Sequence, residues 1–223
     1  MKTEATKNSI RESVKEYTLR DSTVWLLHLR EMSGAELEYM CACCSMERQK
    51  KAELLKSEAK RRQSVGAGYL LFLLKKHFSI EEEPVICDGG KPVFPGNSEV
   101  YFNLSHSGDY AALAFGNRPL GVDIECVKRA NLKVAKRFFQ REEYEVVSER
   151  EETEQADAFF RIWTGKEAVV KAAGGGLSVP LDSFSVLEER LECSGNVYEL
   201  CQRKLTEHGQ TLWISVAQTI AHI

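Results

Sequence analysis

Residues 160–176 read FRIWTGKEAVVKAAGGG, and together with the strand-like LGVDIE at residues 120–125 they are the most informative part of this chain about its fold. Formed as a helix, the longer stretch places Trp163, Glu167 and Lys171 on one face, because residues four apart are neighbours on an α-helix. An exposed Glu–Lys pair beside a core tryptophan would give the same spacing. The closing glycines are typical of a helix end and a loop, and without a Gly-Lys-Ser/Thr ending they do not form a P-loop.

The segment LGVDIE alternates as a strand does. Asp123 and Glu125 would project to one side while Val122 and Ile124 point into the core. Two carboxylates aimed at one place repel each other unless a cation or protons intervene, although a solvated strand face is the simpler alternative. With Glu167 added, the acids offer only oxygen ligands. Such a set suits Mg²⁺, a hard ion that usually keeps waters and binds substrate phosphates.

The remaining chain predicts an α+β fold. Helices are expected over residues 34–76 and 132–173, the second region with breaks near Gln140 and Thr153, and a proline-rich loop over residues 81–98. Strands are expected at residues 23–29, 101–104, 110–115, 120–125, 184–187, 198–201 and 211–217. These elements divide the chain into a frayed or loosely helical extension (residues 1–22), a first half (23–118) and a second half (119–223).

Composition narrows the class of protein. The 223 residues are 43% hydrophobic and 28% charged, as in a soluble globular protein. The net charge of −3 predicts no general attraction to nucleic acid or to an anionic membrane, so a polyanion site would be local. Residues 1–22 lack the apolar segment of a signal peptide, no run is long enough to span a membrane, and the seven cysteines are odd in number. We therefore expect a cytoplasmic protein with reduced thiols.

The stretch FNLSHSG at residues 102–108 contains a serine–histidine pair. Adjacent residues rarely have the geometry of a nucleophile and its base, and no GxSxG elbow is present, which disfavours a hydrolase. A turn over residues 105–109 that offers hydroxyls, N–H groups and an imidazole to phosphate fits better. Further basic residues come from the predicted helices, where Arg48 and Lys51 share a face, although a solvated basic helix has the same pattern.

These motifs together resemble the 4′-phosphopantetheinyl transferase family. The resemblance rests on GVDIE followed by WTGKEAVVKAAGGG, with GGKPVF and NLSHSG before them, and it extends from about residue 24 to about residue 216. The chain length suits the larger, monomeric type that activates nonribosomal peptide and polyketide synthetases as well as fatty-acid carriers. That type is a pseudo-dimer of two similar α/β halves with the active site in the cleft between them, so the resemblance implies the same fold here.

The resemblance also implies roles for individual residues. Asp123, Glu125 and Glu167 would hold Mg²⁺, with Mn²⁺ as an alternative ion, and Glu167 would act as the base, directly or through water. Lys171 would contact the phosphate and balance its charge. The first half would grip coenzyme A, and the second half would carry the metal and catalytic residues. The implied coenzyme A-binding set is Arg48, Lys51, Ser64, Lys91, Pro92, Ser105, His106, Asp123 and Lys171.

The implied activity is transfer of 4′-phosphopantetheine from coenzyme A, as co-substrate, to a serine of an apo acyl or peptidyl carrier protein. The implied protein is a monomer that engages carrier proteins and neither nucleic acid nor membrane. Two alternatives stay open at this point. One is a coenzyme A-binding sensor or scaffold without turnover, and the other is an unrelated Mg²⁺-dependent phosphotransferase for a small substrate.

Overall fold

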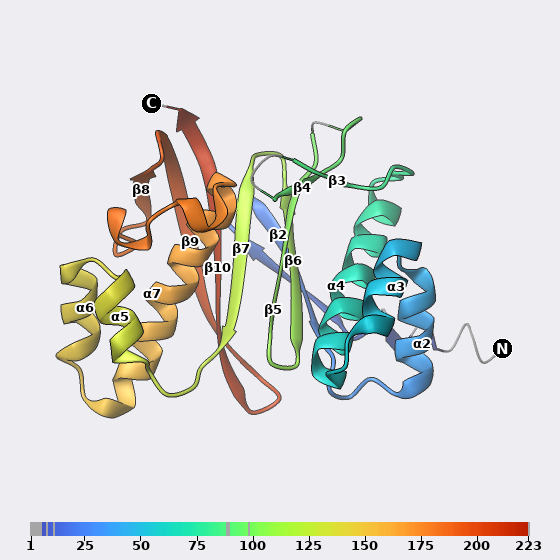
Figure 1. Cartoon of the computed structure of the whole chain (residues 1–223), viewed down its shortest axis with the longest axis horizontal. Coiled ribbons are helices and arrows are strands. Elements are labelled where there is room, and N and C mark those ends of the chain that lie inside the picture. The colour runs from blue at the N-terminus through green and yellow to red at the C-terminus, as the bar shows by residue number, and fades with distance from the viewer. Residues whose placement is uncertain (1–5, 8, 11, 88–89, 98, 223) are drawn as a thin grey trace.

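The computed structural model describes residues 6–7, 9–10, 12–87, 90–97 and 99–222 (Figure 1). Parts of the predicted extension, Gly89 of the GGKPVF motif, Ser98 of the predicted loop and Ile223 lie outside the described residues. No helix within the described ranges is both long and apolar enough to cross a membrane.

Helical residues at 6–7, 9–10 and 12 come first in the described part of the chain, and the first half then contains six strands and the helices α2, α3 and α4. In chain order these are β1 (Val14–Leu19), β2 (Ser22–His28), α2 (Gly34–Cys43), α3 (Met46–Leu54), α4 (Glu58–His77), the short β3 (Val85–Ile86) and β4 (Pro92–Val93), β5 (Tyr101–Ser107) and β6 (Tyr110–Gly116). The second half consists of β7 (Leu120–Cys126), α5 (Leu132–Phe138), α6 (Arg141–Ser148), α7 (Glu152–Ala173), two 3₁₀ turns (Gly176–Ser178 and Leu181–Ser183), β8 (Arg190–Cys193), β9 (Asn196–Glu207) and β10 (Gln210–His222). The α+β prediction is confirmed.

The two halves share one plan. In each, a strand (β2 or β7) is followed by helices of which the last is the longest, and then by a hairpin (β5–β6 or β9–β10) whose second strand pairs with that earlier strand. The first sheet has the order β1-β2-β6-β5 and the second β7-β10-β9-β8, and every pairing in both is antiparallel. Two similar halves, each of helices and a four-stranded antiparallel sheet, are therefore present, as predicted.

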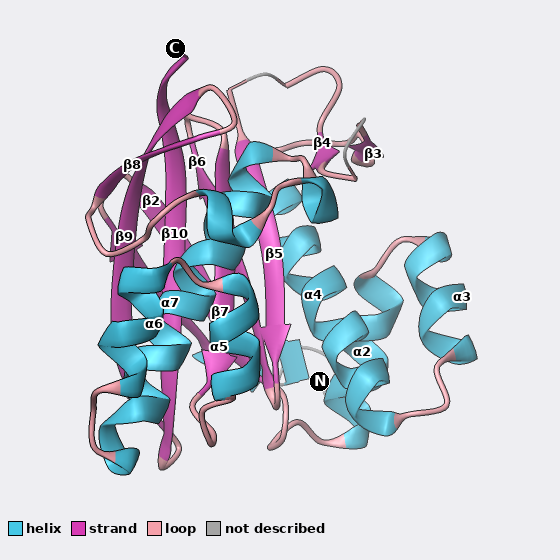
Figure 2. Ribbon diagram, turned by 60° about the vertical axis from the view of Figure 1, so that its left-hand side comes forward, coloured by secondary structure: helices cyan, strands magenta, loops and turns pink. Residues whose placement is uncertain are grey.

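The halves stack as four layers, with helices outside and the two sheets inside (Figures 1 and 2). Alternate residues of β2 show the arrangement, because Trp25 and Leu27 pack toward the first half's helices while Val24 and Leu26 pack between the sheets. The opposing sheet contributes Val122 and Ile124 to that central layer. Strands buried on both faces read as continuous apolar runs, which explains why the sequence marked β2, β6 and β7 so clearly.

Three predictions about local structure were wrong. Residues 14–19 are no frayed extension but the edge strand β1, whose outward charges disguise its alternation, since Leu19 is buried and Lys15 pairs with Glu207. The turn expected over residues 105–109 shrinks to a two-residue hairpin loop at Gly108 and Asp109, because β5 continues through Ser107. Residues 184–187 form no strand, and β8 at residues 190–193 was not predicted.

A fully buried ion pair explains why residues 184–187 are not a strand. Lys166 Nζ lies 2.7 Å from Glu143 Oε2, and neither side chain is exposed. Lys166 also donates to the carbonyl of Phe184, and Glu143 Oε1 accepts from the N–H of Val186, at 2.7 and 2.8 Å. The backbone groups that a strand ladder would use are therefore bonded to these two side chains, which fix the segment against α6 and α7.

We expect Glu143→Gln to lower the free energy of unfolding by about 3–5 kcal/mol, because Lys166 is left buried without a counter-charge. The double variant Glu143→Leu/Lys166→Met should recover part of this loss, since no charge is then buried. Denaturant titration measures both. The control is Glu145→Gln on the same helix, which disrupts the exposed pair with Arg141 and should change stability little. Equal losses from Glu143→Gln and Glu145→Gln would contradict this account.

Candidate active site

The two sheets meet where edge strand β5 runs alongside edge strand β7, a junction we call the β5–β7 seam. The strands run in parallel and belong to different sheets, and side chains of β5 accept hydrogen bonds from N–H groups of β7, nineteen residues further along the chain. The three bonds join Asn103 Oδ1 to Val122 N at 3.0 Å, Ser105 Oγ to Ile124 N at 3.4 Å, and Ser107 Oγ to Cys126 N at 3.2 Å. Side chains thus take the place of a backbone ladder.

The same serine hydroxyls hold the acids of β7. Ser105 Oγ donates to Asp123 Oδ1 at 2.8 Å, and Ser107 Oγ donates to Glu125 Oε2. Because a hydroxyl has one donor and two acceptor positions, Ser105 can bridge a backbone N–H and a carboxylate at once. The register of the seam therefore determines where both carboxylates lie.

Lys171 on α7 completes the centre of the cluster. Its ammonium group lies 2.6 Å from Asp123 Oδ1, 3.0 Å from Ser105 Oγ and 3.1 Å from the carbonyl oxygen of Val122, which occupies its three N–H donors. Asp123 is only 5% exposed, and its second oxygen, Oδ2, is buried without a hydrogen-bond partner among the described residues. A buried acceptor without a partner is costly, so Asp123 Oδ2 is the atom open to a further ligand.

Glu167 lies one turn before Lys171 on the same face of α7, as predicted. Burial raises the pKa of the Glu167 carboxyl, and the charge of Asp123 raises it further. Burial also raises the pKa of Glu125, in spite of the hydrogen bond from Ser107 that lowers it. The three acids therefore repel one another in a poorly solvated place, as expected of carboxylates that share a site.

The acids fit a hard divalent cation in their chemistry. All their ligand atoms are oxygens, and Asp123 Oδ2 is free to coordinate. Their oxygens are more widely spaced than in a closed metal site. Among the described residues, the group of three potential ligand atoms that all lie within 4.8 Å of one another is formed by His28, Glu31 and His208. This spacing agrees with their mutual repulsion and with the engagement of Asp123 Oδ1 by Lys171.

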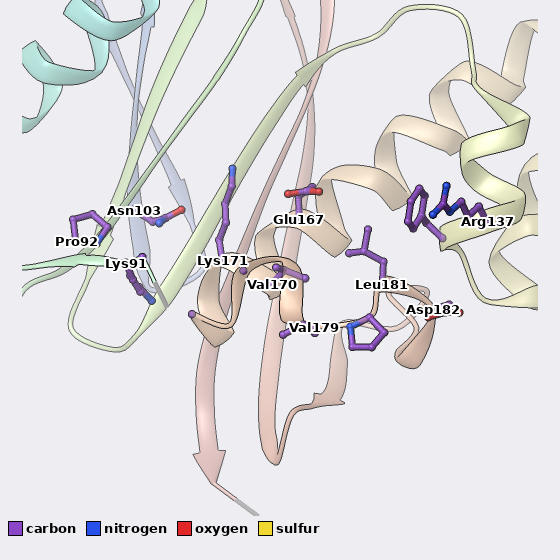
Figure 3. A pocket seen from close by; sticks show the side chains of 15 residues that line it. Lys91, Pro92, Asn103, Arg137, Glu167, Val170, Lys171, Val179, Leu181 and Asp182 are labelled. Carbon is purple, nitrogen blue, oxygen red and sulfur yellow. The ribbon is translucent and has the colours of Figure 1, made fainter. Parts of the chain in front are cut away.

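A pocket of ≈ 450 Å³ opens beside these residues and draws its walls from both halves. Figure 3 shows Glu167 and Lys171 side by side on α7, with Lys91, Pro92 and Asn103 to one side of them and Arg137 to the other. The remaining wall follows the end of α7 and the turns after it, through Val170, Gly174, Gly176, Val179, Pro180, Leu181 and Asp182. The pocket therefore joins charged groups to an apolar wall, as small-molecule sites commonly do.

Several predicted binding residues lie at this pocket or close to it. Lys91 and Pro92 line it, and burial lowers the pKa of Lys91 to about 8 while its ammonium group donates to the carbonyl of Ala172 at 3.3 Å. Desolvation lowers the pKa of His106 most, and the positive charges of Lys171 and Arg48 lower it further. Arg48 and Lys171 therefore both contribute positive charge at His106.

Two predicted residues are not joined to the cluster. Lys51 is exposed on α3, and Ser64 is buried on α4 with no partner for its hydroxyl among the described residues. No hydrogen bond or ion pair within those residues connects either side chain to the acids. Their binding role stays a prediction.

Sequence reasoning missed several residues of the site. Asn103 and Ser107 hold β7, and Arg137 and Asp182 line the pocket. The signal for the first two was present, since Asn103, Ser105 and Ser107 share one face if β5 is a strand, and the expected turn concealed it. Arg137 and Asp182 carried no signal, because only the packing of α5 and the second 3₁₀ turn brings them here.

Comparison with known proteins agrees with this geometry. Residues 119–212 match the model of the 4′-phosphopantetheinyl transferase superfamily. The chain is 34% identical over 172 residues to the 4′-phosphopantetheinyl transferase Sfp of Bacillus subtilis, with 75% of each chain covered, and 36% identical over 178 residues to ffp of the same species, again with 75% of each covered. It is 43% identical over 138 residues to AcpT of Salmonella typhimurium, which covers 60% of this chain and 70% of AcpT.

The matched segment begins just before the acids of β7 and includes all of α7. Similarity of this extent assigns the protein to a class of transferases. The chain belongs to the 4′-phosphopantetheinyl transferase family, as its motifs predicted.

Removing a side-chain acceptor of the seam should destabilise the protein. We expect Asn103→Ala to lower the free energy of unfolding by about 1–3 kcal/mol, because the buried N–H of Val122 loses its partner. Urea titration measures the change. Asn117→Ala, in an exposed turn, is the matched control and should have almost no effect. Similar behaviour of the two variants would mean that the seam bond contributes nothing to stability.

Removing the charge of Glu167 should stabilise the metal-free protein. A carboxyl whose pKa is raised by folding binds its proton more tightly when folded, so its ionisation destabilises the fold above that pKa and has no effect well below its ordinary value of 4.5. Glu167→Gln should therefore raise Tm by a few degrees at neutral pH with a chelator present, and the difference should shrink as the pH falls toward 4.5. A Tm below that of the wild type at neutral pH would contradict this.

Proposed function

We propose that the protein transfers the 4′-phosphopantetheine group of coenzyme A to a serine of an apo acyl or peptidyl carrier protein. Family membership supports the reaction class. The observation that carries the assignment is the cluster at the seam, where Asp123 keeps one oxygen without a partner beside Lys171 and Glu167. The active site is then the pocket between the two halves.

The second half supplies the reacting groups in this proposal. Asp123, Glu125 and Glu167 would hold Mg²⁺, or Mn²⁺ in its place, and the ion when bound would neutralise charge on the pyrophosphate. Glu167 takes the proton of the carrier serine, directly or through water. Its pKa is raised by burial and by Asp123, the direction that suits a proton acceptor working near neutral pH.

The serine oxygen forms a bond to the β-phosphorus of coenzyme A as its proton passes to Glu167. The bond from that phosphorus to the bridging oxygen breaks, and adenosine 3′,5′-bisphosphate leaves with the bridging oxygen. Lys171 donates to the phosphate oxygens as charge builds up on them, so the protein acts mainly by positioning and electrostatics.

In this proposal the first half binds the nucleotide end of coenzyme A. Lys91, His106 and Arg48 gather positive charge or N–H donors near the pocket, and Lys51 and Ser64 extend the set toward the adenosine 3′-phosphate. Burial lowers the pKa of Lys91 to about 8, so an arriving phosphate that favours the charged form would raise it again. Pro92 and Ser105 complete the proposed coenzyme A site, and the enzyme acts as a cytoplasmic monomer that docks its carrier transiently.

The reaction is tested by mixing the purified protein with coenzyme A, Mg²⁺ and a panel of apo carriers, and weighing each carrier by mass spectrometry. A productive carrier gains one phosphopantetheine group. Glu167→Gln should slow this gain by about 10²–10⁴-fold, and Asp123→Ala should abolish it. The matched control, Glu154→Gln, removes an exposed acid at the other end of α7 and should leave the rate unchanged.

Each failure has a distinct meaning. A wild-type protein that binds coenzyme A but modifies no carrier would support the sensor or scaffold role in place of turnover. Near-wild-type transfer by Glu167→Gln would remove Glu167 from the mechanism. Transfer that needs no divalent ion would remove the metal role of Asp123, Glu125 and Glu167.

A further inference from the structure

A second cluster of potential ligands lies away from the pocket, where turns from both halves come together. His28 ends β2, Glu31 follows in the loop to α2, and His208 occupies the turn between β9 and β10. One nitrogen or oxygen of each lies within 4.8 Å of the others. In Figure 1 the β9–β10 turn and the β5–β6 turn extend from the same lower end of the two sheets, opposite the end that carries β3 and β4.

The cluster is held by the backbone around it. His208 has a φ of 48° and Gly209 a φ of 75°, the paired left-handed conformations of a tight hairpin turn, so the position of His208 is fixed by its turn. The N–H of Leu29, next to His28, donates to the carbonyl of Asp109 at 2.7 Å, and Tyr110 Oη donates to the carbonyl of Glu207 at 2.9 Å. The first bond fixes the loop after His28 within the first half, and the second connects the two halves next to His208.

The side chains already interact with one another. The rings of His28 and His208 stack with centroids 4.0 Å apart and planes 20° apart, and Nδ1 of His208 lies 3.4 Å from Oε1 of Glu31. On its other side His28 stacks against Tyr110. Nδ1 of His28 is enclosed and has no hydrogen-bond partner among the described residues, so this nitrogen is open to a ligand.

We propose that His28, Glu31 and His208 bind a divalent transition-metal ion of the Zn²⁺ class that links the two halves of the protein. Two imidazoles and one carboxylate form a ligand set typical of zinc, with water in the fourth position, and are a poor set for Mg²⁺. The stacked rings must tilt apart for one nitrogen of each to face the ion. Glu31 and His208 have side chains 69% and 35% exposed, which leaves them room to move and leaves the ion a path from solvent.

The surrounding charges are compatible with a neutral, metal-binding His28. Burial and His208 lower the pKa of His28, and Arg30 acts in the same direction, while Glu31 and Asp109 oppose them. Metal binding requires deprotonated imidazole, so a lowered pKa favours it at neutral pH. Because the ligands come from both halves, a bound ion would stabilise the assembled protein relative to the unfolded chain.

The test is a Zn²⁺ titration of the full chain, which is first stripped of metal with a chelator and kept reduced. Excess Mg²⁺ is present so that the carboxylates beside the pocket are not available to Zn²⁺. One Zn²⁺ should bind per chain and raise Tm. His208→Gln should abolish this binding, and Glu31→Gln, at an exposed position that does not threaten folding, should weaken it by at least about tenfold. His77→Gln, which removes an exposed histidine of α4 outside the cluster, should bind as the wild type does.

Co²⁺ replaces Zn²⁺ in a second measurement to exclude the cysteines, some of which are accessible in the fold. Bound Co²⁺ should show visible absorption without a thiolate charge-transfer band, and the absorption should be lost in His28→Gln/His208→Gln. A thiolate band, unchanged Zn²⁺ affinity in both Glu31→Gln and His208→Gln, or no Zn²⁺ binding by the wild type would each overturn the proposal. None of these results depends on whether the protein transfers phosphopantetheine.

Discussion

The β5–β7 seam is the contact on which the rest of the structure depends. Both strands are sheet edges, and edges present backbone groups that must be bonded or left to solvent. Here Asn103, Ser105 and Ser107 satisfy the N–H groups of β7 from one side, which joins the sheets without merging them. The spacing of two residues is essential, because only alternate residues of β5 face β7. The seam thus connects the halves and holds the acids at their junction.

The cluster of Asp123, Glu125, Glu167 and Lys171 suits the binding of a ligand better than it suits the stability of the fold. Three carboxylates face a poorly solvated space, and Lys171 neutralises only part of their charge. An apolar set of the same size would pack without this repulsion. Conflicts of this kind, where local chemistry opposes folding, are typical of functional sites. The oxygen of Asp123 that has no partner among the described residues is its clearest sign, since a buried acceptor without a partner destabilises the folded chain.

The sequence was informative where one periodicity governed a whole element. Strand alternation in LGVDIE placed Asp123 and Glu125 on one face of β7, and helical spacing in residues 160–173 placed Glu167 and Lys171 on one face of α7. These elements are largely buried, so nearly all of their core-facing positions hold apolar residues. The polar residues among them are therefore easy to recognise. The sequence also made the α+β class and two halves predictable, because the order of strands and helices repeats.

The sequence misled where tertiary partners replaced local ones. β1 was missed because an edge strand carries charges on its open face, and Lys15 finds its partner, Glu207, in the other half. Residues 184–187 looked like a strand because Phe184 and Val186 are apolar, but their backbone groups bond to a lysine and a glutamate that pattern alone could not pair.

The close approach of α7 to β7 determines how near Glu167 and Lys171 lie to the acids of the strand. A β-carbon at Gly121 would lie 2.2 Å from the carbonyl oxygen of Ala168 and 2.3 Å from the N–H nitrogen of Ala172, so only glycine permits this contact. Gly121 stands two residues before Asp123 on the strand, and Ala168 and Ala172 each follow a site residue on the helix. Any side chain at Gly121 would push α7 outward and lengthen the 2.6 Å contact between Lys171 and Asp123. The glycine of GVDIE is therefore as much a part of the site as its two acids.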